Sequence, residues 1–327
     1  MKRTATWAAA AMLLLPWLAA GQEAASVADT TDLADLTPAE LFLRASSSAL
    51  QFEAMREPSR RLLVRSHEES VPYLVTVLDT DDARERHALE DIFIRIGDPG
   101  VDPLIGALER ETERTDTSRG ARLAAGILGR IGEIRALGPL MAARTHLDWK
   151  VRAAVAGALG RIGVNDAAPG LTELVGDENE IVRQSAAVGL SRVAEAADEE
   201  LGHGAIDALL GALEDPYYSV RYSAARALAA AGEPALAALE ELAAEGGGTA
   251  RILAVQALGQ TGSGAAVRTL RDLLESEDWA VSAHAAEALG KIGLTGNDRK
   301  ELERMIERGI HPFVAHKIEL ALEADRR

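Results

Sequence analysis

The residues best suited to chemistry in this chain are its histidines, because the sequence contains no cysteine. Without a thiol there can be neither a disulfide nor a thiolate zinc site. The 7 histidines share no metal-ligand spacing along one helix face; they are His67, His87, His146, His203, His284, His311 and His316. The chain also lacks an HExxH, P-loop or G-x-S-x-G motif. We therefore expect a protein that is not an enzyme, with no catalytic residues, metal site or cofactor.

Basic side chains recur at intervals of about 31 residues along much of the chain. The members of this basic row are Arg95, Arg130, Arg161, Arg192 and Lys291, with Ala230 and Gln260 at the two remaining equivalent positions. A regular basic row can bind an acidic protein or an anionic polymer. The alternative is structural, because the helix dipole favours basic residues at helix C-termini.

Aromatic residues, which make up only 4% of the chain, also occupy equivalent positions. They are Trp149, Tyr218 and Trp279. Exposed aromatic side chains are common anchors in protein interfaces. The alternative is that each one packs over the start of its own helix. The basic and aromatic rows together are the candidate partner-binding residues.

These side chains belong to an internal repeat, in which an acidic start is followed by Val-Arg, a run of alanines and Ala-Leu-Gly-x-Ile-Gly. Its clearest copies span residues 148–163, 177–194, 215–232, 249–262 and 278–293, and weaker copies end at Gly97 and Gly132. Asp or Thr before each copy and Gly after it are typical helix start and stop signals. Each unit therefore predicts two helices, the first of which carries the Val-Arg motif.

A helix pair of this kind cannot bury its apolar face alone, so neighbouring pairs must stack into one continuous core. The content of 47% hydrophobic residues, mostly small and aliphatic, suits close helix packing. We expect an all-α fold, a right-handed α-α superhelix of the HEAT-like solenoid type. The Val-Arg helices are expected to line its concave face.

The string D-x-x-V-R-x-x-A-A-x-A-L-G-x-I-G resembles the HEAT-like repeats of the phycobilisome-lyase type over roughly residues 56–327. Proteins with such repeats include bilin lyases and many bacterial scaffolds, so the resemblance implies a bacterial repeat protein without implying lyase chemistry. The resemblance also implies that the arginine of the motif bridges successive repeats. This motif arginine is found at Arg86, Arg152, Arg183, Arg221 and Arg251, whereas Ala121 and Ser282 occupy two equivalent positions.

The deoxyhypusine hydroxylase type of HEAT-like protein binds iron through repeated His-Glu pairs. In this sequence only His67-Glu68 forms such a pair. One pair provides too few ligands for a di-iron site. A lyase-like or metal-dependent enzyme on this fold remains the alternative to a non-catalytic protein.

The ends of the chain differ from the repeats. Residues 1–21 combine a basic start, an apolar run and a small-residue cleavage site, which predicts a signal peptide and a periplasmic or secreted protein with no membrane span after cleavage. The other predicted segments are a flexible arm at 22–36, a degenerate capping repeat at 37–79, HEAT-like repeats at 80–310 and a capping helix at 311–327.

The formal charge of −16 becomes −18 once the leader and its two basic residues are removed. Such a charge argues against nucleic acid as a partner. We therefore expect a non-catalytic protein–protein interaction scaffold of the bacterial cell envelope that binds a protein partner along its repeat surface. Binding of an anionic envelope polymer by the basic row is a further alternative.

Overall fold

The structure is a computed structural model, and it describes residues 33–112, 118–196 and 202–324. The predicted signal peptide and most of the predicted arm lie outside these residues. Within the described range, Leu33–Asp35 forms a short 3-10 helix, η1. Leu33 and Leu36 pack against the hydrophobic core, so the packed body begins inside the segment expected to be a flexible arm.

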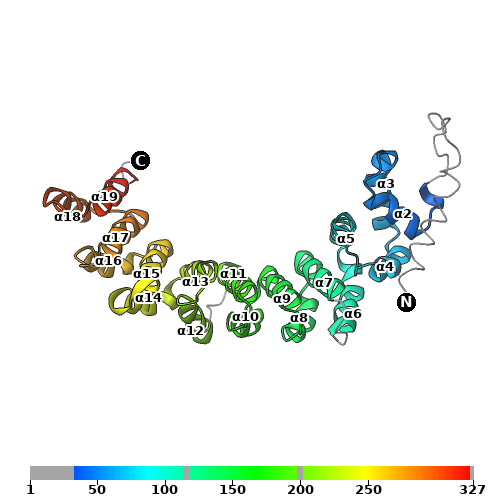
Figure 1. Cartoon of the computed structure of the whole chain (residues 1–327), viewed down its shortest axis with the longest axis horizontal. Coiled ribbons are helices and arrows are strands. Elements are labelled where there is room, and N and C mark those ends of the chain that lie inside the picture. The colour runs from blue at the N-terminus through cyan, green and yellow to red at the C-terminus, as the bar shows by residue number, and fades with distance from the viewer. Residues whose placement is uncertain (1–32, 113–117, 197–201, 325–327) are drawn as a thin grey trace.

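The described helices form two rows along a curved body (Figure 1). The inner, concave row comprises α3 (Arg56–Arg65), α5 (Ala83–Ile96), α7 (Arg119–Ile131), α9 (Trp149–Ile162), α11 (Glu180–Ala196), α13 (Tyr218–Ala231), α15 (Gly248–Thr261), α17 (Trp279–Ile292) and α19 (Pro312–Ala324). The outer row comprises α2 (Pro38–Ser46), α4 (His67–Thr76), α6 (Val101–Thr112), α8 (Leu137–Ala143), α10 (Ala168–Val175), α12 (His203–Ala212), α14 (Glu233–Glu245), α16 (Val267–Leu274) and α18 (Gly296–Glu307). The expected all-α, HEAT-like solenoid is confirmed, with the Val-Arg helices on the concave side.

The predicted start and stop signals operate at several helix ends, but α15 begins at Gly248, so the predicted start residue Thr249 lies inside the helix. The Asp148 and Asp278 side chains each accept a hydrogen bond from the backbone N–H two residues later, which caps α9 and α17. Gly132 and Gly163 end α7 and α9 in the left-handed conformation, with φ of 79° and 69°. Short 3-10 helices then lead into the outer helices; they are η3 (Asp98–Gly100), η4 (Ile134–Ala136), η5 (Asn165–Ala167) and η6 (Gly264–Ala266).

Glycines inside the inner helices set the distance between neighbouring repeats. A Cβ atom on Gly160 of α9 would lie 2.4 Å from the Cα of Gly189 on α11. One on Gly129 of α7 would lie 2.4 Å from the Cα of Ala158. The glycine of Ala-Leu-Gly is therefore needed because two helix backbones nearly touch at this point.

The junction between α5 and α7 departs from this arrangement. Ile94 of α5 stands where α7, α9, α15 and α17 have glycine, and its side chain remains half-exposed. These two helices pack less closely than α7 and α9 do. An ion pair between Glu90 and Arg130, with 2.9 Å between carboxylate oxygen and guanidinium nitrogen, bridges the junction.

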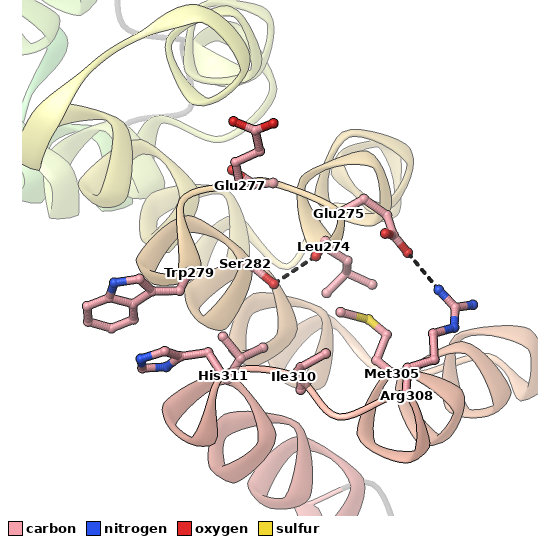
Figure 2. A pocket seen from close by; sticks show the side chains of 11 residues that line it. Leu274, Glu275, Glu277, Trp279, Ser282, Met305, Arg308, Ile310 and His311 are labelled. Carbon is pink, nitrogen blue, oxygen red and sulfur yellow. Dashed lines mark hydrogen bonds and ion pairs between the residues drawn. The ribbon is translucent and has the colours of Figure 1, made fainter.

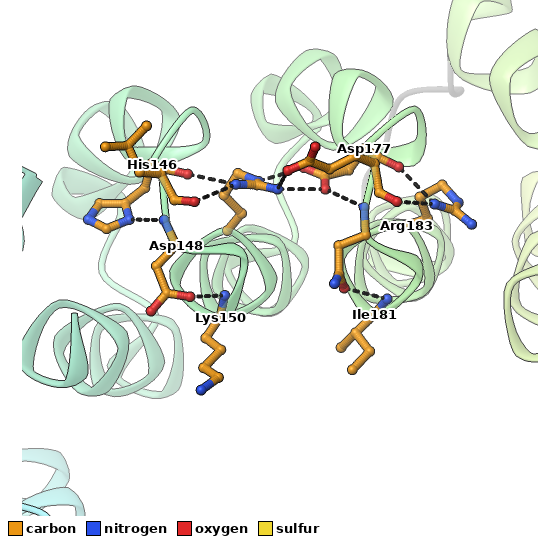
Figure 3. Close-up of polar contacts among 10 residues, drawn as sticks. His146, Asp148, Lys150, Asp177, Ile181 and Arg183 are labelled. Carbon is orange, nitrogen blue, oxygen red and sulfur yellow. Dashed lines mark hydrogen bonds and ion pairs between the residues drawn. The ribbon is translucent and has the colours of Figure 1, made fainter. Parts of the chain in front are cut away.

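The motif arginines form a polar ladder between repeats (Figure 3). Arg152 donates two hydrogen bonds to the Asp177 carboxylate of the next repeat, at 2.6 and 2.9 Å. Arg183 does the same to Asp215, at 2.6 and 3.1 Å. The bridging role that the resemblance implied for the motif arginine is confirmed at these two residues.

The N-terminal segment contains one helix more than the sequence indicated. A capping box formed by Thr37 and Glu40 starts α2. The degenerate capping repeat predicted at 37–79 implied two helices, of which α4 is the second. Between the two lies α3, which is rich in arginine and buries only Ser59 and Leu63.

Candidate functional site

The concave face between α7 and α13 combines a floor of small residues with exposed basic side chains. On α9, positions 150, 154, 157 and 161 share one helix face because they are three or four residues apart. Ala154 and Gly157 on this face are half-exposed, and Lys150 and Arg161 are exposed. A Cβ atom on Gly126 of α7 would meet no atom within 4 Å, so the floor is also open there.

Equivalent positions on the neighbouring inner helices, together with Arg122 beside them on α7, add further basic residues. We call the whole set the concave patch: Arg119, Arg122, Arg130, Lys150, Arg161, Arg192 and Arg226. Arg130 pairs with Glu90, and Arg119 lies 3.9 Å from Asp81. Among the described residues, Arg161 and Arg192 have no carboxylate partner. The patch therefore carries a local positive charge that the protein itself does not neutralise.

Four of the inner helices lack acidic residues altogether. The sequences of α7, α9, α13 and α15 contain no Asp or Glu, although the whole chain has 51 acidic residues against 35 basic ones. The outer helix α14 has the opposite character, with four glutamates and no basic residue: Glu233, Glu240, Glu241 and Glu245. Although the chain as a whole is negatively charged, these four inner helices carry a net positive charge.

The arginines at the centre of the patch repel one another. Burial lowers the pKa of the Arg161 guanidinium below its ordinary value, and the charges of Arg192 and Arg130 lower it further. The more distant Glu90 opposes this shift only in part. An anion bound here would relieve the repulsion, which favours binding of a negatively charged ligand.

The structure brings three of the five predicted basic residues together. Arg130, Arg161 and Arg192 lie on the adjacent helices α7, α9 and α11. Arg95 on α5 is held by Glu57 at 2.9 Å and Asp91 at 3.2 Å. Lys291 lies at the far end of the row.

Lys291 is separated from the three central arginines by α13 and α15, where the equivalent positions hold Ala230 and Gln260. Its ammonium group pairs with Glu287 at 2.8 Å. The predicted row is therefore a central cluster with a neutralised basic residue at each end.

The predicted aromatic residues lie on α9, α13 and α17, which are not adjacent in the inner row, and they differ in exposure. Trp149 is half-buried against the core and lies under the Lys150 ammonium, as a packing role requires. Tyr218 is 62% exposed and stacks on Tyr222. Trp279 is 48% exposed. Since aromatic and basic residues stand at opposite ends of their helices, about 18 Å apart at a rise of 1.5 Å per residue, they line opposite edges of the concave face.

The repeat spacing alone did not predict Lys150 or Arg119 as members of the patch, nor the lack of Asp and Glu in α7, α9, α13 and α15. A count of Asp and Glu in each predicted helix would have shown this lack, because the Val-Arg helices of four repeats contain neither residue.

His146 and His284 have contacts that indicate structural roles. The His146 ring is buried and its Nδ1 accepts a hydrogen bond from the Asp148 N–H at 3.0 Å. Burial is the main cause of the lowered pKa of His284, which lies beside Gln256 and Glu287. Among the described residues, no group of three or more His, Asp or Glu side chains is arranged to hold a metal ion.

Glu287 on α17 gives a pH-dependent prediction. Burial alone would raise its pKa, but hydrogen bonds from Lys291 and Lys317 and their charges lower it from 4.5 to about 2. Because the folded pKa is below the unfolded one, the stabilisation is present above pH 4.5 and is lost as the pH falls towards 2. Glu287→Gln should lower the free energy of unfolding by about 1–3 kcal/mol at pH 7.

Urea denaturation at pH 7 and pH 2.5 measures this effect, with the exposed Glu303→Gln as the control. The difference between Glu287→Gln and the parent should shrink at the lower pH, and a constant difference would contradict the assignment. The control should match the parent at both pH values.

Solved structures share this fold at low sequence identity. A chain in the structure of Kap95p bound to RanGDP is 12% identical, with a TM-score of 0.56, covering 88% of this chain and 47% of that chain. The phycocyanin lyase CpcE–CpcF complex of Nostoc sp. PCC7120 is 22% identical, covering 78% and 94%, with a TM-score of 0.40. Human deoxyhypusine hydroxylase is 22% identical, covering 82% and 99%, with a TM-score of 0.35. No curated protein sequence matches the chain.

In the part of the chain that the structure describes, no helix has both the length and the apolar character that crossing a membrane requires. Models of HEAT repeats match residues 101–191 and 248–323, and a single HEAT repeat matches residues 205–233. These segments coincide with the stacked layers from α6 to α19 and cover more than half of the sequence. The predicted HEAT-like repeats are confirmed, and the chain belongs to the HEAT-repeat family.

Proposed function

We propose that this protein is a non-catalytic interaction scaffold of the bacterial cell envelope, and that it binds an acidic protein partner on the concave face between α7 and α13. The observation that carries the proposal is the arginine cluster around Arg161 and Arg192, because three of the four helices of this face, α7, α9 and α13, contain no Asp or Glu. HEAT-repeat solenoids generally bind other proteins, and Kap95p binds RanGDP.

The geometry of this concave face suits a polypeptide ligand. The floor at Gly126, Ala154 and Gly157 lets a partner backbone approach closely. Carboxylates on that segment would form charge-assisted hydrogen bonds with Arg161 and Arg192. Tyr222, which is 44% exposed, adds an aromatic contact at the edge of the patch.

A second candidate function is the binding of an anionic envelope polymer. Arg130, Arg161 and Arg192 stand on consecutive layers, which HEAT-type packing spaces at about 8–10 Å. A regular row of this kind suits a ligand with repeating anionic groups. Retention on a sulfated polysaccharide that persists when acidic polypeptides compete would favour this candidate over a protein partner.

The proposed location is supported by the basic and apolar composition of residues 1–21. Mass spectrometry of the protein isolated from its own cells tests it. A mature N-terminus at Gln22 in the envelope fraction is the expected result, and an intact leader in the cytosol would contradict the proposal.

Charge reversal tests the binding face. The triple variant Arg130→Glu, Arg161→Glu and Arg192→Glu should weaken partner binding by more than about tenfold, because attractive contacts become repulsive. The matched control is Arg110→Glu, Arg268→Glu and Lys300→Glu, which makes the same change in net charge at exposed positions of the outer helices.

The measurement is photo-crosslinking in living cells followed by mass spectrometry, with the crosslinker at Gln184 or Tyr222 on the concave side. Both positions should capture the same protein in the parent and in the control variant. Equal capture by the triple variant and the control would exclude the concave patch as the binding face.

A further inference from the structure

The layer formed by α17 and α19 lacks the arginine ladder of the earlier repeats. In three of those repeats the motif arginine uses Nη1 to bind the two backbone carbonyls six and five residues before it. The pairs are Arg152 with His146 and Leu147, Arg183 with Asp177 and Glu178, and Arg221 with Asp215 and Pro216, all at 2.7–3.1 Å. Each repeat thus builds the same guanidinium site from its own loop.

On α17 the motif position holds Ser282, whose hydroxyl donates to the Leu274 carbonyl at 2.7 Å. The carbonyls that a motif arginine would bind belong to Ser276 and Glu277. Among the described residues, no donor replaces the guanidinium at these carbonyls. Gly309 stands where the earlier ladder has Asp177 or Asp215, so both sides of the ladder contact are missing in this layer.

A pocket of about 290 Å³ occupies this position (Figure 2). Its lining includes the motif-position residue Ser282 and both loop residues, Ser276 and Glu277. Leu274 and Met305 form part of its apolar base. This volume is at the lower end of the range for small-molecule pockets, and it suits a single side chain better than a cofactor.

The walls of the pocket offer the groups that a cation with a planar head prefers. Trp279 stacks on His311 with ring centroids 4.7 Å apart, and it remains 48% exposed. Glu275 pairs with Arg308 at 3.5 Å, whereas Glu277 has no cationic partner among the described residues. In the ladder itself, Arg221 lies over the ring of Tyr218, which is the residue equivalent to Trp279.

We propose that this pocket binds an arginine side chain of a partner polypeptide, which takes the place of the motif arginine absent at Ser282. The guanidinium would donate to the Ser276 and Glu277 carbonyls and face the Trp279 ring, and the charge of the exposed Glu277 carboxylate nearby would attract it. The site lies on the loops between α16 and α19, away from the concave patch. The two proposals are therefore tested independently: a negative result at this pocket does not contradict partner binding at the concave patch, and the reverse also holds.

The probe is a capped Gly-Arg-Gly peptide, with binding followed by calorimetry and by the indole NMR signal of Trp279. We expect saturable binding of the peptide and binding at least about tenfold weaker when citrulline or lysine replaces arginine, because neither offers the charged planar fork. Equal binding of the citrulline or lysine peptide would overturn the proposal. Tighter binding of free arginine than of the peptide would overturn the polypeptide source.

Two variants test the position of the site. Ser282→Arg restores the motif residue and should abolish peptide binding, whereas Ser282→Ala should retain it. Peptide binding that survives in Ser282→Arg would overturn the proposal. Because Glu277 is exposed, Glu277→Gln leaves packing intact and should weaken binding severalfold; unchanged affinity in this variant would also count against the site.

Discussion

Gly160→Ala should destabilise the solenoid by about 2–4 kcal/mol, although alanine is a better helix former than glycine. The added Cβ would lie 2.4 Å from the Cα of Gly189 and 3.2 Å from the adjoining carbonyl oxygen. Both neighbours are backbone atoms, so no side-chain rotation can make room. Helices α9 and α11 must move apart, and the apolar contacts along their whole junction weaken together.

Gly126→Ala is the matched control, since Gly126 also lies inside an inner helix. A Cβ there would meet nothing within 4 Å, so the substitution should stabilise the protein by about 0.5–1 kcal/mol. Urea denaturation followed by circular dichroism compares the midpoints of the two variants. Opposite shifts are expected, and a stabilising effect of Gly160→Ala would show that the inner helices do not approach closely at this residue.

The close approach at Gly160 also explains why the fold was predictable from the sequence. A repeat of about 31 residues that keeps Ala and Leu at fixed positions specifies a similar helix pairing from layer to layer. Glycine is less constant, because Ile94, Ser191 and Ala229 replace it on α5, α11 and α13; with the bulky Ile94, α5 and α7 pack less closely than α7 and α9 do. Helix α3 was missed because its composition, with four arginines among ten residues, hides a short apolar face.

The candidate sites were less predictable, since they depend on differences between repeats. The aromatic row suggested one continuous surface, but the equivalent residues on α11 and α15 are Glu180 and Gly248, which separate the three rings. The pocket beside Ser282 arises from two substitutions, at Ser282 and Gly309, whose connection becomes visible only once the arginine ladder is known. The net charge gave no sign of the basic patch, because a single total cannot show that α7, α9, α13 and α15 lack Asp and Glu.

Arg152→Met should lower the free energy of unfolding by about 3–5 kcal/mol at pH 7, because it leaves a buried carboxylate without its main partner. The Asp177 side chain is 8% exposed. Burial alone would raise its pKa, but hydrogen bonds from Arg152 and the Asn179 N–H, with the charges of Arg152 and Arg183, outweigh burial and hold the pKa below its ordinary value. The carboxylate of the parent protein is therefore stabilised in its ionised form.

The sign of the pH dependence follows from this lowered pKa. Asp177 stabilises the parent protein above its unfolded pKa of about 3.9, and that contribution is lost as the pH falls through the lower folded value. The difference between the parent and Arg152→Met should therefore shrink in acid. Urea denaturation at pH 7 and at pH 3 measures it.

Arg221→Met is the control for Arg152→Met, because Arg221 bonds two loop carbonyls but no carboxylate. Its Nε already lacks a hydrogen-bond partner, so less is lost when the side chain is replaced. In Arg221→Met, Asp215 keeps both of its hydrogen bonds from Arg183. The loss of stability in Arg221→Met should therefore be smaller, and less dependent on pH, than the loss in Arg152→Met. Equal losses in the two variants at pH 7 would show that the carbonyl contacts, rather than the carboxylate bridges, hold successive repeats together.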